Sequence, residues 1–183
     1  MKKIVSLLLT IAMLCCSLLP ALAEASTAPT ITVDEFKTAM DTLAKVHIDW
    51  DLTWIDEEGI CAADMATNPI LVYNEAGYVT NAMVAFSVSP DDDVESMTSL
   101  FIIVCALTAA APAVCDGVDA ATAPDLVWAD LQTMLSNLTS ETQMVFGNLY
   151  GATAIVMLAE NEEGGVDMSM IFIYNDPTAE VAE

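Results

Sequence analysis

The sequence predicts an α+β domain, in which helices pack on one face of an antiparallel sheet of about five to seven strands. The expected order of elements is α-β-β-β-β-α-α-β-β-β. Three segments carry apolar residues at helical spacing, and shorter apolar runs separated by turn residues lie between and after them. Strands that occur in groups, rather than alternating singly with helices, are typical of an antiparallel sheet covered by helices on one side.

A capping box marks the start of the first helix. Thr32 stands at the N-cap, and Glu35 follows three residues later, where its side chain can reach back to the cap. Apolar residues and the single histidine then recur at the spacing of one helical face: Phe36, Met40, Leu43 and His47. The segment therefore predicts an amphipathic helix that ends near His47.

Four strands separated by turns are predicted after this helix, at residues 48–54, 60–65, 70–73 and 78–88. The first alternates strictly, so that its apolar side chains share one face of a half-buried strand: Ile48, Trp50, Leu52 and Trp54. An acidic turn at 56–59 follows it. A hairpin turn at 74–77 joins the last two strands, which are therefore expected to pair.

Two consecutive helices are predicted next. The first is expected to begin with Ser89 at the N-cap and Pro90 at the first helical position. It should end near Ala111, because Pro112 follows. The second starts at 122–125 and carries an apolar stripe made of Val127, Leu131, Met134, Leu135 and Leu138.

The first of these two helices contains an uncharged stretch, residues 96–115, that is long enough to span a membrane. Both flanks of the stretch are acidic, and no Lys or Arg lies beside it to set an orientation. We therefore expect a helix buried in a water-soluble domain rather than a membrane span.

Three strands complete the domain, at 143–149, 152–160 and 166–174. The last two are joined by Asn-Glu-Glu-Gly-Gly at 161–165, which is the strongest hairpin signal in the chain. The three strands are therefore expected to pair in sequence order.

The first 23 residues have the pattern of a cleavable bacterial signal peptide. Two lysines precede an uncharged apolar run at 4–19, and Pro20 ends that run. Small residues stand at the −3 and −1 positions of the expected cleavage site, which is formed by Ala21, Ala23 and Glu24. We therefore expect a secreted, extracellular protein, or a periplasmic one where the host has an outer membrane.

A lipoprotein signal is the nearest alternative, because Cys15 and Cys16 lie at the end of the apolar run. Such signals require a small residue before the modified cysteine, and Leu14 is not small. The ordinary signal peptide is therefore the preferred interpretation.

Removal of residues 1–23 leaves a chain that divides into three parts. Residues 24–31 are small and polar, as in a short tether, and residues 176–183 have the composition of a disordered tail. Residues 32–175 form a single acidic α+β domain, which is long enough to bury a hydrophobic core.

The charge balance of the mature chain restricts its partners. The chain holds 27 acidic residues and no arginine, and after cleavage only Lys37 and Lys45 oppose them, which gives a net charge of −25. Nucleic acid and anionic membrane surfaces are not expected as partners, because binding to them requires cationic side chains. The expected partner is an unknown protein or small-molecule ligand, and no motif predicts a cofactor.

Three cysteines remain in the mature chain, and they are the candidate disulfide participants: Cys61, Cys105 and Cys115. An odd number allows one intramolecular bond at most. Cys115 is the best placed to form it, because it lies in a loop-like stretch. Cys105 lies within an apolar run, which is typical of a buried core residue.

No motif in the chain predicts a catalytic or metal-ligating residue. His47 is the only histidine, and its place at a helix end favours a structural role through the helix dipole. The acids around Asp49 and at 91–93 could form an irregular calcium site, but an EF-hand loop counted from Asp49 lacks its glycine and its final glutamate. Strand alternation and helix capping explain these acids as well.

These observations predict a secreted, non-enzymatic binding or interaction module of unknown ligand, which uses a sheet face or a groove between helix and sheet. Two alternatives stay open: a hydrolase that relies on a pair of carboxylates, and an irregular calcium-binding domain. The binding module is favoured because the sequence has no nucleophile motif, no phosphate-binding loop and no cofactor fingerprint.

Overall fold

The computed structural model describes residues 29–65, 67–89, 91–139, 143–162 and 164–178. The expected signal peptide, with its cleavage site at Ala21, Ala23 and Glu24, lies outside these residues.

Seven strands form one fully antiparallel sheet in the order β1-β2-β3-β4-β7-β6-β5. The strands are β1 (Trp54–Glu57), β2 (Ile60–Ala63), β3 (Ile70–Tyr73), β4 (Val79–Val88), β5 (Met144–Leu149), β6 (Ala152–Glu160) and β7 (Val166–Ile173). Strands β1 to β4 are one meander and β5 to β7 are another, and the pairing of β4 with β7 joins them.

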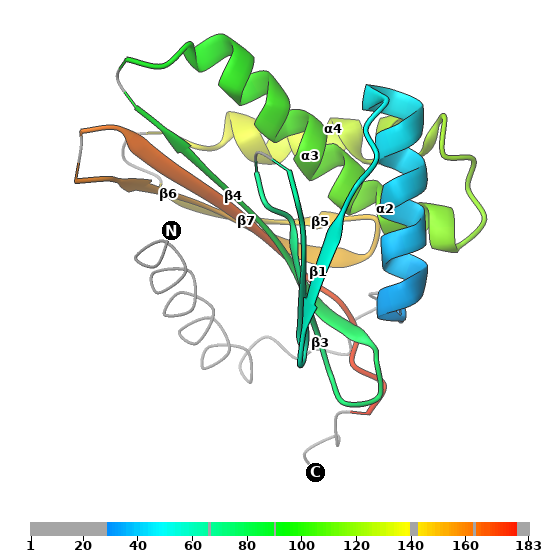
Figure 1. The fold of residues 1–183 in the computed structure, drawn as a ribbon. Coiled ribbons are helices and arrows are strands. Elements are labelled where there is room, and N and C mark those ends of the chain that lie inside the picture. Colours follow the sequence, from blue (N-terminus) through cyan, green and yellow to red (C-terminus); the bar gives the residue numbers. More distant parts are fainter. Residues whose placement is uncertain (1–28, 66, 90, 140–142, 163, 179–183) are drawn as a thin grey trace.

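Three helices lie on one face of this sheet: α2 (Val33–Ile48), α3 (Val94–Cys115) and α4 (Ala123–Ser136). Figure 1 shows α3 between the other two helices, with α2 beside the β1–β2 end of the sheet. Helix α3 contacts β4, and α4 contacts β5. The predicted fold class and order of elements are confirmed.

The predicted capping box at the start of α2 is present. The backbone N–H of Glu35 donates to the Thr32 hydroxyl at 3.3 Å, and the backbone N–H of Thr32 donates to the Glu35 carboxylate at 2.9 Å. Hydrogen bonds from the Thr32 hydroxyl and backbone lower the pKa of Glu35. The helix buries one apolar face against the rest of the core: Phe36, Ala39, Met40, Leu43 and Ala44.

The predicted strand at 48–54 is wrong, because α2 extends to Ile48 and β1 begins only at Trp54. Asp49 takes a left-handed backbone conformation (φ 49°) and ends the helix. Its carboxylate and that of Asp51 lie 2.8 and 3.2 Å from the Lys45 ammonium. The acidic positions that produced the alternation therefore serve one lysine at a helix end, and they do not reflect a pleated strand.

The boundaries of α3 also differ from the prediction. Its N-cap is Asp93, which accepts hydrogen bonds from the backbone and the hydroxyl of Ser96, at 3.4 and 2.7 Å. The predicted cap Ser89 lies outside the helix, and Pro90 lies outside the described residues. The bonds from Ser96 lower the pKa of Asp93.

Pro112 does not end α3, which continues for one more turn to Cys115. A proline cannot donate to the carbonyl four residues earlier, so this turn lacks one backbone hydrogen bond. The turn is nevertheless surrounded by buried alanines at 109, 110, 111 and 113. Their packing compensates for the missing bond, and Cys115 therefore lies on a helix and not in a loop.

Helix α3 is long and apolar enough to cross a membrane, and it is the one such helix among the described residues. Within its most apolar window, however, 61% of the residues are buried inside the protein. The Phe101 ring, for example, packs against Phe86 of β4 with 5.5 Å between the ring centroids. The helix is therefore the central core helix of the fold, as the sequence predicts.

The packed domain extends beyond residues 32–175 at both ends. Ile31 is 2% exposed, and its carbonyl accepts a hydrogen bond from Val79 at 2.8 Å. At the other end, the Asn74 side chain donates to Asp176 and Thr178 at 2.8 and 2.9 Å. The expected tether and tail thus contribute contacts to the domain where the structure describes them.

The hairpin between β6 and β7 brings Gly165 against the backbone of β4. A Cβ atom at this position would overlap the carbonyl oxygen of Val88. The adjacent Gly164 has a positive φ of 79°, but open space surrounds the site of its Cβ. The two glycines are therefore required for different reasons, close approach at one and backbone conformation at the other.

We expect Gly165→Ala to lower the free energy of unfolding by about 3 kcal/mol, because the overlap is with backbone that cannot rotate away. Gly164→Ala is the matched control and should cost only about 1 kcal/mol, the strain of a left-handed alanine. Urea unfolding of residues 24–183 measures both. Equal losses in the two variants would contradict the close approach of Gly165 to β4.

Candidate functional site

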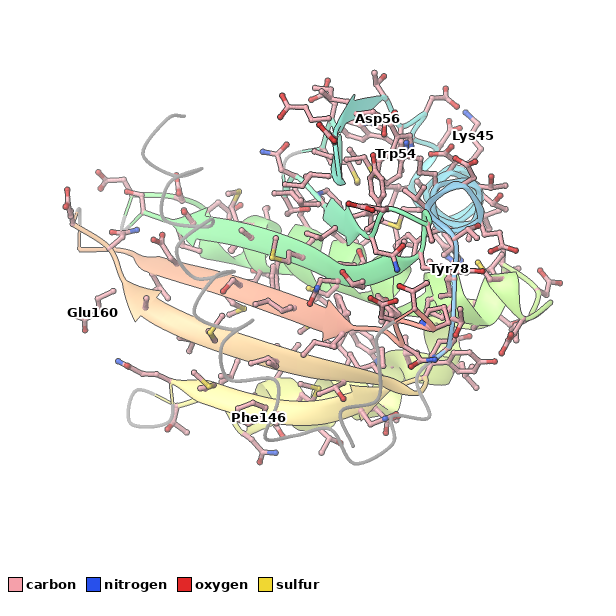
Figure 2. All side chains as sticks on the ribbon, turned by 90° about the horizontal axis from the view of Figure 1, so that it is seen from below. Lys45, Trp54, Asp56, Tyr78, Phe146 and Glu160 are labelled. Carbon is pink, nitrogen blue, oxygen red and sulfur yellow. The ribbon has the colours of Figure 1, made fainter. Side chains whose placement is uncertain are left out.

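The register of the strands assigns every sheet residue to one of two faces. Ala82, Val84 and Phe86 of β4 are buried on the side of α3. Because side chains alternate along a strand, Met83 and Ala85 point to the side without helices. Figure 2 views the sheet from below, with α3 and α4 behind the strands and α2 seen end-on beside them.

One residue from each strand forms a continuous apolar row on this helix-free face. The paired positions run across all seven strands as Ile55, Ala62, Ile70, Met83, Ile171, Ile155 and Phe146. Directly opposed side chains on one face of a sheet contact each other. We call these seven residues the apolar row.

The apolar row is exposed at its two ends. Ile55 in β1 is 60% exposed and Phe146 in β5 is 59% exposed, whereas Ile171 and Ile155 near the middle are buried. Met144 lies two residues before Phe146 on the same face and is 48% exposed. Figure 2 shows Phe146 on the outermost strand, at the edge opposite Trp54 and Asp56. The exposed apolar side chains of this face therefore lie toward its two edges, and β5 carries two of them.

The helix layer also contains depressions. One is an apolar groove of about 240 Å³ between the end of α2, α3 and α4, and its lining includes the exposed side chains of Ile103 and Trp128. Another, of about 350 Å³, lies between α2 and the end of α3, with Thr38 and Cys115 in its lining. Neither is combined with a group of convergent charged side chains of both signs.

Most of the candidate calcium-binding acids have structural partners. Asp56 pairs with Lys37 of α2, and Lys37 also lies 5.7 Å from the centroid of the Trp54 ring.

Asp49 and Asp51 pair with Lys45, so the explanation by strand alternation is wrong. Helix capping does explain Asp93, as predicted. Among the described residues, no three His, Cys, Asp or Glu side chains lie close enough together to hold a metal ion.

His47 occupies the last turn of α2, as predicted, and is exposed. Its Nε2 donates a hydrogen bond to the carbonyl oxygen of Ala120 at 2.8 Å. Ala120 lies in the loop before α4, so the bond joins two parts of the helix layer. The contact agrees with a structural role for this histidine.

The three candidate disulfide participants are free thiols in the structure. Cys61 in β2 and Cys105 in α3 are buried, whereas Cys115 is exposed at the end of α3. Desolvation, together with the nearby charges of Glu35 and Asp116, raises the pKa of the Cys115 thiol to about 11. Desolvation also raises the pKa of Cys61 to about 11. Neither thiol is therefore activated as a nucleophile at neutral pH.

Comparison with protein-family models, with curated proteins and with solved structures finds no significant match for this chain. The site must therefore be judged from its own residues.

The sequence did not predict the apolar row. The residues of the row lie in strands that carry apolar side chains on both faces, so apolarity alone does not tell the two faces apart. Their alignment depends on the pairing of β4 with β7, two strands separated by about eighty residues. No local pattern specifies that pairing, because register between distant strands is set by the packing of the whole sheet.

We expect His47→Ala to lower the free energy of unfolding by about 1 kcal/mol, the net contribution of one intramolecular hydrogen bond. Val46→Ala is the control, since Val46 is 52% exposed in the same helical turn and its loss should change stability little. Urea unfolding compares the variants. A loss of binding by folded His47→Ala would show that the residue belongs to the functional site.

The net charge, together with the structural partners found for the acids, predicts how the stability of the fold responds to salt. At a net charge of −25, salt should stabilise the chain by screening, and calcium and magnesium should act alike. A calcium site would add about 2.7 kcal/mol at a hundredfold excess over its Kd. Thermal melting of residues 24–183 in sodium, magnesium and calcium chloride at matched ionic strength distinguishes the two. A saturable shift specific to calcium would contradict the structural role of these acids.

Proposed function

We propose that this chain is a secreted, non-enzymatic binding module that binds its ligand on the helix-free face of the sheet. The apolar row is the observation that carries the proposal. It extends across all seven strands and leaves large apolar side chains exposed, such as Ile55 and Phe146. Exposed apolar surface on an otherwise charged protein is typical of an interaction site.

The rest of the chain supports binding rather than catalysis. Asp49 and Asp56 are engaged with lysines, and Asp93 caps a helix. The one histidine bonds a backbone carbonyl, and the thiols of Cys61 and Cys115 have raised pKa values. General acid–base or nucleophilic chemistry requires such groups to be free and close to each other.

The charge of the chain limits the chemistry of the ligand. The chain has 27 acidic residues, and after the expected cleavage only two lysines oppose them. A ligand that is apolar and either uncharged or cationic meets no electrostatic penalty on approach, whereas an anionic one is repelled. We therefore propose an apolar protein segment or small molecule without net negative charge.

We expect Met83→Glu to abolish ligand capture, because it places a charge in the middle of the apolar row. Leu126→Glu is the matched control. It adds the same charge on α4, where Leu126 is 51% exposed and lies on the helix layer. Residues 24–183 and both variants are immobilised and exposed to culture supernatant of the producing cells, and thermal melting confirms that each is folded.

Components retained by the parent chain and by Leu126→Glu, but lost from Met83→Glu, would support binding on this face. Equal retention by both variants would place the ligand elsewhere. Turnover of a polysaccharide or peptide substrate by the parent chain, abolished by a single carboxylate-to-amide substitution, would instead favour the hydrolase.

A further inference from the structure

We propose that β5 is a dimerisation edge, on which two copies of this chain pair their β5 strands antiparallel to each other about Phe146. The pairing would join two seven-stranded sheets into one continuous sheet. It uses the exposed end of the apolar row, but it does not depend on the identity of the ligand proposed above.

The outer edge of β5 presents backbone groups that no described strand pairs. Strand β5 is the last in the sheet and is bonded to β6 alone. The backbone N–H of Leu158 donates to the carbonyl of Gln143 at 2.7 Å, so Gln143 points its backbone groups toward β6. Since these groups alternate along a strand, Met144, Phe146 and Asn148 point theirs outward.

This edge lacks the features that usually prevent strand pairing. The six residues of β5 include no charged residue and no proline, and their register with β6 is continuous, without a bulge. Natural proteins protect edges with such features. The opposite edge is protected, because β1 has four residues, two of which are Asp56 and Glu57. In a chain with 27 acids, an uncharged edge is therefore a distinctive surface.

A second copy of the chain is the occupant that fits this edge best. Antiparallel pairing about Phe146 places it opposite the same residue of the other copy and Met144 opposite Asn148 of the other copy. Every outward N–H then meets an outward C=O, and the two-fold axis makes the contact self-complementary. Two copies at a net charge of −25 repel each other overall, but neither β5 strand carries a charge of its own.

Side chains on the helix-free face favour the same register. Phe146 and Met144 are 59% and 48% exposed in the single chain. In the pair, the two Phe146 rings are direct cross-strand neighbours, and the apolar row becomes continuous through both copies. The two largest exposed side chains of this edge are thereby covered by one contact.

Sedimentation equilibrium of residues 24–183 at physiological salt tests the proposal, with one pair of variants in which only one keeps the outward backbone N–H. Met144→Ala and Met144→Pro remove the same side chain, but only proline removes the outward N–H. Proline is tolerated at the first residue of an edge strand, so the bonds to β6 remain. We expect Met144→Ala to dimerise and Met144→Pro to dimerise at least about tenfold more weakly. Phe146→Lys should be monomeric.

Amide hydrogen exchange on the parent chain provides a test that requires no variant. The amides of Met144, Phe146 and Asn148 should become protected as the protein concentration rises, while exposed amides elsewhere should not. A parent chain that stays monomeric up to near-millimolar concentration would overturn the proposal. So would equal dimerisation of Met144→Pro and Met144→Ala, or concentration-independent exchange at β5.

The test of dimerisation can be distinguished from the test of ligand binding on the helix-free face. Met83→Glu should lose ligand capture and remain dimeric, because Met83 lies three strands from the β5 edge. Met144→Pro should lose dimerisation and retain capture. An edge that instead takes up an added extended peptide while the chain alone is monomeric would identify a heterologous partner and reject the dimer.

Discussion

The pairing of β4 with β7 is the contact on which the rest of this structure depends. It joins eight residue pairs from two meanders that are linked in sequence by α3 and α4. It also aligns Val84 with Met170 and Ala82 with Phe172, all buried beneath the helices. Without this pairing each meander would expose both an unpaired edge and one side of its core. A pairing so distant in sequence is costly in chain entropy, and burial of the α3 face compensates for that cost.

The very acidic composition is accommodated by keeping charge at the periphery of the sheet. The central strand pair has no charged residue except Asp167 near its end, and α3 is uncharged from Ser96 to Cys115. The two lysines of the domain are both placed on α2, where Lys37 pairs with Asp56 and Lys45 pairs with Asp49 and Asp51. The exposed pairs of Lys45 contribute little stability individually and lie at the end of α2. The pair of Lys37 with Asp56 joins the first half of α2 to β1.

The two faces of the sheet therefore have different roles. The face toward the helices carries the core, including Met170 and Phe172. The other face carries the apolar row, which is not needed to bury the helices and yet ends in two strongly exposed apolar residues. Such a surface has a stability cost in water, which is why we propose that it binds a ligand on the face and a second copy at the β5 edge.

Local sequence alone determined most of the elements. The capping box at Thr32 and Glu35, the hairpins at 74–77 and 161–165, and strands β3 and β6 follow directly from residue patterns, because caps and tight turns depend on a few adjacent residues. At 48–54 another local interaction prevailed over the strand pattern, because Lys45 pairs with Asp49 and Asp51 at the end of α2. At Pro112 tertiary packing prevailed, because buried alanines hold the last turn of α3. The order of the strands, the apolar row and the unprotected β5 edge were decided only by the tertiary structure, because each is a product of pairing between residues far apart in the chain, on which no local spacing depends.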